Sequence, residues 1–332
     1  MSEEETTKNI KRVRLPANME ILPPSEDYIF KALLTHPDAK PALVDLVAAV
    51  IGREAESIAD VQILNNELPA MGTDEKNERL DLNCILADGT QVNVEMHGSR
   101  LEEPVLGGNE NFLGKYIYYL TDLHSSQKSK GVKYHDLART YQVTFCTYNI
   151  FPSSGNYVTR ANMRTADGTL VSDRINMVII ELNKLGEVLK KPVGEMSSLD
   201  IWSAYLGYVS DPNRRELMNK MIERKEVLEM ASDVLMNISK DDHERAKFRS
   251  RRKYETDLAS NVLTAEARGE ARGEARGEAR GEARGQVRGE ALGEARGIAK
   301  EANEILDLIK KGYDIEQIEK VLQERATTYN AQ

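Results

Sequence analysis

The segment from Arg79 to His97, RLDLNCILADGTQVNVEMH, constrains the fold more than any other part of the sequence. Apolar and polar residues alternate on both sides of Ala87-Asp88-Gly89, which predicts two antiparallel strands joined by a tight turn. A two-residue loop would place Asp81 and Glu95 on opposite faces of the hairpin, because a shift of one residue turns every side chain over. A three-residue loop closed by Gly89 in the left-handed region pairs Leu86 with Thr90 and Asp81 with Glu95. We predict this second loop, because it gathers the apolar side chains of both strands on one face.

The other face of the predicted hairpin is polar and carries Asp81, Asn83, Gln91, Asn93, Glu95 and His97. Two directly opposed carboxylates destabilise a sheet unless a positive charge lies between them. A divalent cation would relieve this repulsion, and oxygen ligands suit magnesium or manganese. Such an ion could activate water for phosphodiester hydrolysis. A polar face that simply contacts solvent is the alternative.

Composition limits the classes of protein that the chain can belong to. Its 332 residues carry a net charge of −9, which argues against attraction of nucleic acid by the whole surface and leaves only local patches for DNA. The apolar runs are too short to cross a membrane, and the N-terminus does not resemble a signal peptide. Cys84 and Cys146 both lie in strand-like segments. We expect reduced core thiols in a cytoplasmic protein, with a disulfide as the alternative.

Before the hairpin, the sequence predicts an arm, two helices and a strand. Residues 1–20 are polar, with clustered basic side chains, and are expected to form a flexible arm that contacts phosphate or a plain disordered leader. Ser25 is expected to cap a helix through DYIFKALLT. A second helix, ALVDLVAAVI, should be buried and end at Gly52. A short strand is expected near residues 61–64.

After the hairpin, the pattern alternates between helix and strand. Residues 111–131 have helical spacing with an aromatic stripe that is typical of a core-facing helix. Residues 141–151 alternate as a strand, and residues 157–164 and 169–182 flank the turn Asp167-Gly168 as a second hairpin. This order predicts an α/β fold in which helices flank a mixed sheet across residues 21–195. Residues 196–263 should form a helical region.

The C-terminal part of the chain contains a four-residue repeat, EARG, within residues 264–297. Each glycine costs a helix about 1 kcal/mol relative to alanine, and like charges face each other at a spacing of four residues. An isolated helix should therefore be weak, whereas copies lying side by side could exchange Glu–Arg contacts. We expect either a self-associating tail that makes a homo-oligomer or a disordered spacer. Residues 298–332 predict C-terminal helices divided at Gly312.

These segments together resemble the recombination-promoting nuclease family of transposase-like proteins, which has a PD-(D/E)XK nuclease core. The resemblance covers about residues 21–300 and implies a restriction-endonuclease-like mixed sheet flanked by helices. It rests on DYIFKALL near the N-terminus, ILNNELP before the hairpin, RLDLNCIL and VNVEMH within it, YYLTDLHSSQKSKGVKY after it, IIEL near the end of the sheet, and the glycine-punctuated charged tail.

The resemblance also implies a catalytic site. Asp81 and Glu95 would bind Mg²⁺ or Mn²⁺ together with the carbonyl of Met96. The second position after Glu95 carries glutamine in this family and lysine in the wider superfamily, where it positions or activates the attacking water. His97 departs from both patterns. A neutral imidazole could accept the proton of the water, or the change could mark a site with lost or altered activity.

Four further residues are candidates for auxiliary roles. Asp27 and Lys31 match the D-x-x-F-K pattern of the family, in which the first helix can bring an acidic group beside the metal. A surface ion pair is the alternative for these two residues. Gln127 and Lys130 could reach a phosphate, or they could belong to a solvated helix end.

The sequence thus predicts a metal-dependent DNA endonuclease, linked to recombination or to a mobile element, with Asp81, Glu95 and His97 as catalytic residues. The alternative is a catalytically impaired protein that keeps the nuclease fold and acts in DNA binding or self-assembly. Cleavage of plasmid DNA separates these two hypotheses.

Overall fold

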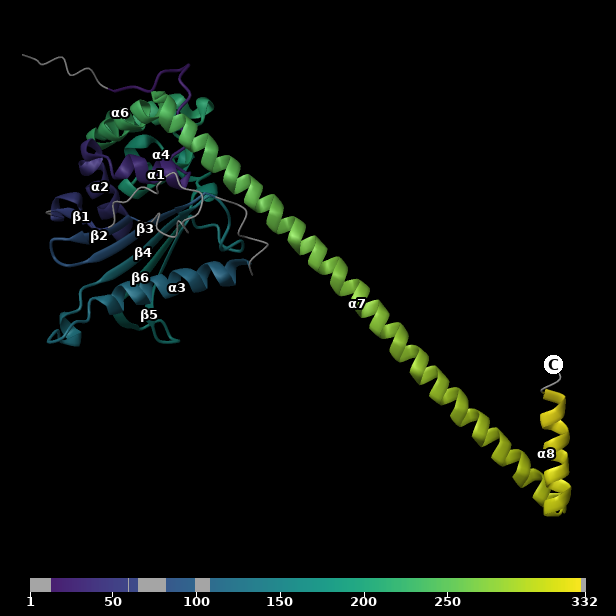
Figure 1. Cartoon of the computed structure of the whole chain (residues 1–332). Helices are drawn as coiled ribbons and strands as arrows, with labels where there is room; N and C mark the ends of the chain where they lie inside the picture. The colour runs from purple at the N-terminus through teal and green to yellow at the C-terminus, as the bar shows by residue number, and fades with distance from the viewer. Residues whose placement is uncertain (1–12, 59, 65–81, 99–107, 330–332) are drawn as a thin grey trace, which may run out of the picture. The chain divides into compact units, whose positions relative to one another are not determined.

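A computed structural model describes residues 13–58, 60–64, 82–98 and 108–329 of the chain (Figure 1). The chain divides into two compact units, residues 1–260 and residues 261–332. The first unit contains a sheet with helices on both faces, and the second is helical. Among the described residues, no helix is both long enough and apolar enough to cross a membrane.

The first unit is built on a six-stranded sheet with the order β1-β2-β3-β4-β6-β5. The strands are β1 (Val61–Ile63), β2 (Leu82–Leu86), β3 (Gln91–His97), β4 (Thr140–Cys146), β5 (Val158–Arg164) and β6 (Leu170–Glu181). β4 runs parallel to both β3 and β6, and the other neighbouring pairs are antiparallel. The mixed sheet predicted from the sequence is confirmed, and only the strand predicted over residues 141–151 ends earlier, at Cys146.

The hairpin of β2 and β3 has the predicted three-residue loop. Leu82 pairs with Val94 and Ile85 pairs with Gln91. The backbone N–H of Leu86 donates to the carbonyl of Thr90 at 2.9 Å, and Gly89 has a φ of 82°. A side chain at this left-handed position would strain the backbone, which explains the glycine. The hairpin therefore presents one apolar face and one polar face.

One face of the sheet is covered by the larger hydrophobic core. Val92, Val94 and Phe145 on this face are completely buried, and the rings of Phe30 and Phe145 lie 6.1 Å apart. Figure 1 shows the covering helices on one side of the sheet and α3 on the other. The helices on the core side are α1 (Asp27–Leu34), α2 (Lys40–Ile51), α4 (Ser198–Tyr208), α5 (Arg215–Arg224) and α6 (Glu226–Lys240).

The opposite face is covered by α3 (Gly108–Ser126). Phe112, Tyr116 and Leu120 of this helix are buried against Met177 and Ile179 of β6 in a second, smaller cluster. The spacing of these three residues places them on one side of the helix. The prediction that the aromatic stripe belongs to the core is therefore confirmed.

The N-terminal prediction needs two corrections. Residues 13–22 pack against the helices instead of forming a mobile arm, because Leu15 and Leu22 are buried. The amide of Asn219 exchanges hydrogen bonds with the backbone of Leu15 at 2.8 and 3.3 Å. Residues 1–12 lie outside the described part of the chain. Ser25 does not cap α1, whose N-cap is Glu26 without a side-chain bond, whereas the predicted end of α2 at left-handed Gly52 is confirmed.

The last two helices are α7 (Asp242–Lys310) and α8 (Ile315–Tyr329). α7 begins in the first unit and contains the whole EARG repeat, whose side chains are exposed. Gly312 adopts a φ of 86° and separates the two helices, as predicted. Residues 298–310 continue α7, which corrects the expectation of a separate short helix there.

Both cysteines are buried thiols that form no disulfide with a described residue. Cys84 lies on the apolar face of the sheet, within the large core, whereas Cys146 lies in the cluster beneath α3. Their positions on opposite faces of the sheet explain the absence of a disulfide between them. Burial raises the pKa of the Cys84 thiol to about 12.

Candidate functional site

Glu95 lies near the carboxyl end of β3, where it is only 7% exposed. It is in register with Thr144 of the parallel neighbour β4. Side chains alternate along a strand, so Glu95 shares a face with Asn93 and His97. This is the face that α3 covers. The alternative of a solvated polar face is therefore wrong for Asn93 and Glu95.

The polar side chains next to Glu95 form a buried network between β3 and β4. The Asn93 amide nitrogen donates to Gln142 Oε1 at 2.9 Å, and the Gln142 amide nitrogen donates to Thr144 Oγ1 at 3.4 Å. Asn93 Oδ1 is buried and accepts no hydrogen bond from the described residues. Buried polar atoms are nearly always paired in folded proteins, so this oxygen can accept a further group.

His97 ends β3 among aromatic rings. Its Nδ1 lies 2.6 Å from the hydroxyl of Tyr148. The rings of Phe112, Tyr116 and Tyr148 meet the imidazole edge-on, with centroids 5.7, 6.5 and 5.6 Å away. These contacts fix the plane of the imidazole at the carboxyl end of β3. The tautomer of His97 decides which partner donates the hydrogen bond.

Met96 turns its side chain to the opposite face, where it is 3% exposed in the large core. The thioether side chain is thus buried in the core, away from Glu95. The backbone carbonyl is the group of Met96 that could provide an oxygen ligand. Asp81 lies outside the described residues. Within the described ranges, which lack residues 65–81 and 99–107, no three His, Cys, Asp or Glu side chains gather as a metal site.

The start of α1 lies at the same end of β3. A Cβ atom on Gly98 would come within 2.5 Å of the Ser25 carbonyl oxygen, so the two backbones touch there. This contact places Asp27 and the first turn of α1 beside the end of β3. Lys31, one turn later, is 1% exposed. The expectation of a surface ion pair is therefore wrong for Lys31.

Gln127 and Lys130 lie at the other end of the strands. Gln127 accepts a hydrogen bond from the Ala138 backbone at 2.8 Å and donates to Thr140 Oγ1 at 2.9 Å. Thr140 is in register with Gln91, which lies four positions, about 13 Å, from Glu95 along β3. Gln127 thus anchors the loop before β4, and the exposed Lys130 is separated from the site.

Two further carboxylates surround the start of α1. Burial raises the pKa of Glu26, and the negative charge of Glu255 raises it further, while Arg252 opposes the shift. Burial also raises the pKa of Glu255, against Arg251, Arg252 and His97. The first turns of α7 therefore reach the neighbourhood of His97.

Sequence reasoning did not assign Tyr148, Gln142, Thr144 or Glu255 to this neighbourhood. The first three follow from the parallel pairing of β3 with β4, because parallel neighbours end at the same edge of a sheet. That pairing joins segments about fifty residues apart and has no local sequence signal. Glu255 is more distant still, and its position depends on how α7 packs.

The oxygen-rich donors suit a hard divalent cation, since Glu95 offers a carboxylate and Asn93 a carbonyl oxygen that accepts no hydrogen bond from the described residues. Comparison with known proteins agrees with this chemistry. The family model described as "PD-(D/E)XK nuclease family transposase" matches residues 24–265. No curated protein and no solved structure matches the chain. Because the match covers most of the chain, the protein belongs to the PD-(D/E)XK nuclease family of transposases.

Proposed function

We propose that the protein is a metal-dependent DNA endonuclease that hydrolyses phosphodiester bonds and acts in recombination or for a mobile element. The observation that carries this proposal is the buried carboxylate of Glu95 in a chain of the nuclease family. Glu95 lies two residues before His97, on the same face of β3. Mg²⁺ or Mn²⁺ is the proposed cofactor. When bound, the ion would lower the pKa of a water molecule and offset charge on the phosphate.

In this proposal, Asp81 and Glu95 bind the ion together with the Met96 carbonyl. The hydrogen bond from the Asn93 amide nitrogen to Gln142 Oε1 would hold the Asn93 side chain in place beside Glu95. His97 is the proposed general base, and because its Nδ1 faces Tyr148, proton exchange with water falls to Nε2. Tyr148 would position the imidazole. Asp27 is the proposed further acidic group at this end of β3.

Two parts of the proposal concern the setting of the reaction. The EARG segment of α7 is proposed to associate with a second copy of the chain, because its exposed Glu and Arg side chains repeat every four residues. The buried thiols of Cys84 and Cys146, which form no disulfide with a described residue, support a reducing compartment, for which the cytoplasm is proposed.

Nicking of supercoiled plasmid tests the proposal. Purified protein should convert the plasmid to open-circular DNA with magnesium or manganese and not with EDTA. Asp81→Ala and Glu95→Ala should abolish nicking while the far-UV circular dichroism stays unchanged. Lys190→Ala is a matched control, because Lys190 is exposed and its ion pair is with exposed Glu187.

Two results would contradict the proposal. Nicking by Glu95→Ala at the wild-type rate would show that another site, or a contaminant, cleaves the plasmid. DNA binding by the wild-type protein without cleavage in either metal would favour the impaired nuclease fold, to which the change at His97 also points.

A further inference from the structure

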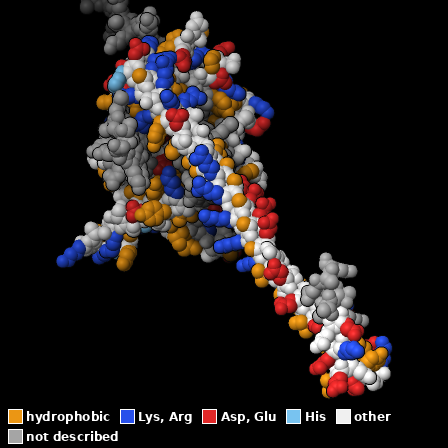
Figure 2. Space-filling view, turned by 45° about the vertical axis from the view of Figure 1, so that its right-hand side comes forward, with side chains coloured by type: hydrophobic (Ala, Val, Ile, Leu, Met, Phe, Trp, Pro, Cys, Tyr) orange, Lys and Arg blue, Asp and Glu red, His pale blue; other side chains and the backbone are white. Residues whose placement is uncertain are grey.

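The first turns of α7 carry a row of basic side chains on the first unit. Residues 245–253 include Arg245, Lys247, Arg249, Arg251, Arg252 and Lys253. This local density contrasts with the net charge of −9 for the whole chain. Figure 2 shows Lys and Arg side chains gathering along one side of α7. The row is therefore a local basic patch on an acidic protein.

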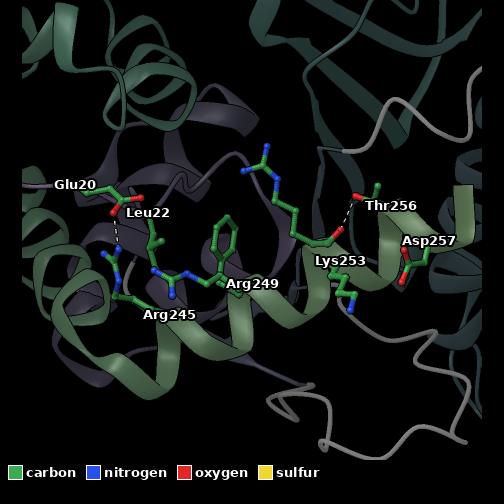
Figure 3. Close-up of a pocket in the computed structure, with 9 residues that line it drawn as sticks. Glu20, Leu22, Arg245, Arg249, Lys253, Thr256 and Asp257 are labelled. Carbon is green, nitrogen blue, oxygen red and sulfur yellow. Dashed lines mark hydrogen bonds and ion pairs between the residues drawn. The ribbon is translucent and has the colours of Figure 1, made fainter. Parts of the chain in front are cut away.

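A surface pocket of about 460 Å³ lies on this part of α7. Arg245, Arg249 and Lys253 follow one another at a spacing of four residues, which places them on one face of the helix. Figure 3 shows this face together with Glu20 and Leu22 of the N-terminal segment. Buried Phe248 anchors the face to the large core. The pocket thus has a fixed floor and charged walls.

The charges of this pocket are only partly balanced. Arg245 forms an ion pair with Glu20. Arg249, Arg252 and Lys253 are exposed, and none of them forms an ion pair with another described residue. Like charges three or four residues apart destabilise a helix. An anion at this face would relieve that repulsion.

The pocket is connected to the candidate catalytic site through α1. Tyr28 of α1 donates a hydrogen bond to Glu244 at 2.5 Å, and the guanidinium of Arg251 lies 4.6 Å from the centroid of the Tyr28 ring. The start of α1 in turn touches Gly98, next to His97. A polyanion bound along α7 would therefore run beside the end of β3 that carries Glu95.

We infer that Arg249, Arg252 and Lys253 bind the phosphate backbone of DNA and guide it to the Glu95 end of the sheet. This inference rests on the proposed nuclease function and names the surface that holds its substrate. Exposed Arg and Lys side chains that form no ion pair with another described residue suit sequence-independent phosphate contacts. Their role is to position the DNA, and they take no part in the chemistry.

Fluorescence anisotropy with a labelled duplex tests the inference on the full chain in EDTA, where binding occurs without cleavage. The variant Arg249→Ala/Arg252→Ala/Lys253→Ala should bind about tenfold more weakly or worse. The slope of log K against log salt should fall in magnitude by about 2.7, or 0.9 for each lost phosphate contact. Arg249→Lys/Arg252→Lys should keep most of the affinity, because it keeps the charges.

The matched control is Lys40→Ala/Lys190→Ala/Lys220→Ala. It removes the same charge from three exposed lysines outside α7, which pair with Asp60, Glu187 and Glu216. We expect less than about a twofold loss of affinity, because lysines that are paired with carboxylates should make few contacts with phosphate. If the α7 triple variant unfolds, Lys253→Ala alone should still reduce the salt slope by about 0.9.

Four outcomes would overturn the inference. Equal weakening in the α7 variant and the control would show a dependence on net charge alone. Unchanged DNA binding, together with loss of binding to phosphatidylserine vesicles, would assign the patch to a membrane surface. The α7 variant could also cleave plasmid as fast as the wild type at low DNA concentration. This result would leave the nuclease proposal standing and refute the role of this surface in DNA binding. No DNA binding by wild-type protein would refute both.

Discussion

The two faces of the sheet at β3 and β4 are equally buried, yet they differ in chemistry. Val94 and Phe145 on one face are fully buried among apolar side chains, whereas Asn93, Glu95 and Gln142 on the other face are at most 7% exposed. Burial of apolar groups stabilises the fold, and burial of a carboxylate or amide costs free energy unless partners compensate. We propose that the polar face is maintained for function and the apolar face for stability.

The apolar face should give the largest effect on stability. Phe145→Ala removes a ring that is completely buried and packs on Phe30, so it should lower the free energy of unfolding by about 3–5 kcal/mol. Urea denaturation monitored by circular dichroism measures this loss. Glu95→Gln on the polar face should lose less than about 1 kcal/mol in EDTA, because it removes a buried negative charge. A larger loss for Glu95→Gln than for Phe145→Ala would reverse the assignment of the two faces.

Substitutions of His97 and its neighbour Tyr148 test whether the polar face takes part in catalysis. His97→Ala should reduce the cleavage rate by about 10²-fold, which is the lower range for loss of a general base. His97→Gln should keep activity, because glutamine is the residue that the resemblance to the family implies at this position. Tyr148→Phe should cause a smaller loss, since it removes only the hydroxyl at 2.6 Å from Nδ1. Single-turnover rates on plasmid measure these effects, and equal rates for all four proteins would show that His97 has no chemical role.

Asp200 shows how a buried carboxylate behaves when its partners are complete. Burial raises the pKa of Asp200, but hydrogen bonds from Tyr157 and the Ser197 backbone, with Lys191, hold it below its ordinary value. Its contribution is therefore present above the ordinary aspartate pKa and lost as the pH falls through the lowered pKa. Asp200→Asn should cost about 1–3 kcal/mol at pH 7. Urea titrations should show that the difference from wild type shrinks below about pH 4; a deficit that is constant with pH would contradict this account.

Deleting residues 266–297 should have the smallest effect on cleavage, because the EARG segment carries none of the proposed site residues. Nicking per molecule should change by less than about twofold. Sedimentation velocity should show self-association of the full chain that weakens with salt, and a monomer after the deletion. A full-length protein that stays monomeric at tens of micromolar, about the range of weak association, would instead make the repeat a spacer.

The sequence predicted the hairpin, its register and its two faces because these features are local. Gly89 and the alternation of side chains determine the loop and the pairing. The burial of the polar face was not predictable in this way, since it depends on α3 packing over β3 and β4. The packing of residues 13–22 and the hydrogen bond between Tyr28 and Glu244 were not predicted either, because they also depend on tertiary packing. These contacts join residues more than 200 positions apart.

Direct measurement of metal binding tests the central claim, that the polar face of β3 holds a divalent cation. Mn²⁺ is titrated into metal-free protein, and the free ion is followed by electron paramagnetic resonance. We expect one bound ion, with affinity reduced about tenfold or more in Glu95→Gln and in Asp81→Asn. Glu181→Gln is the control, because this buried carboxylate at the same end of the sheet is already bound by Lys184 and two backbone amides. Equal affinity in the wild type, Glu95→Gln and Glu181→Gln would contradict the claim.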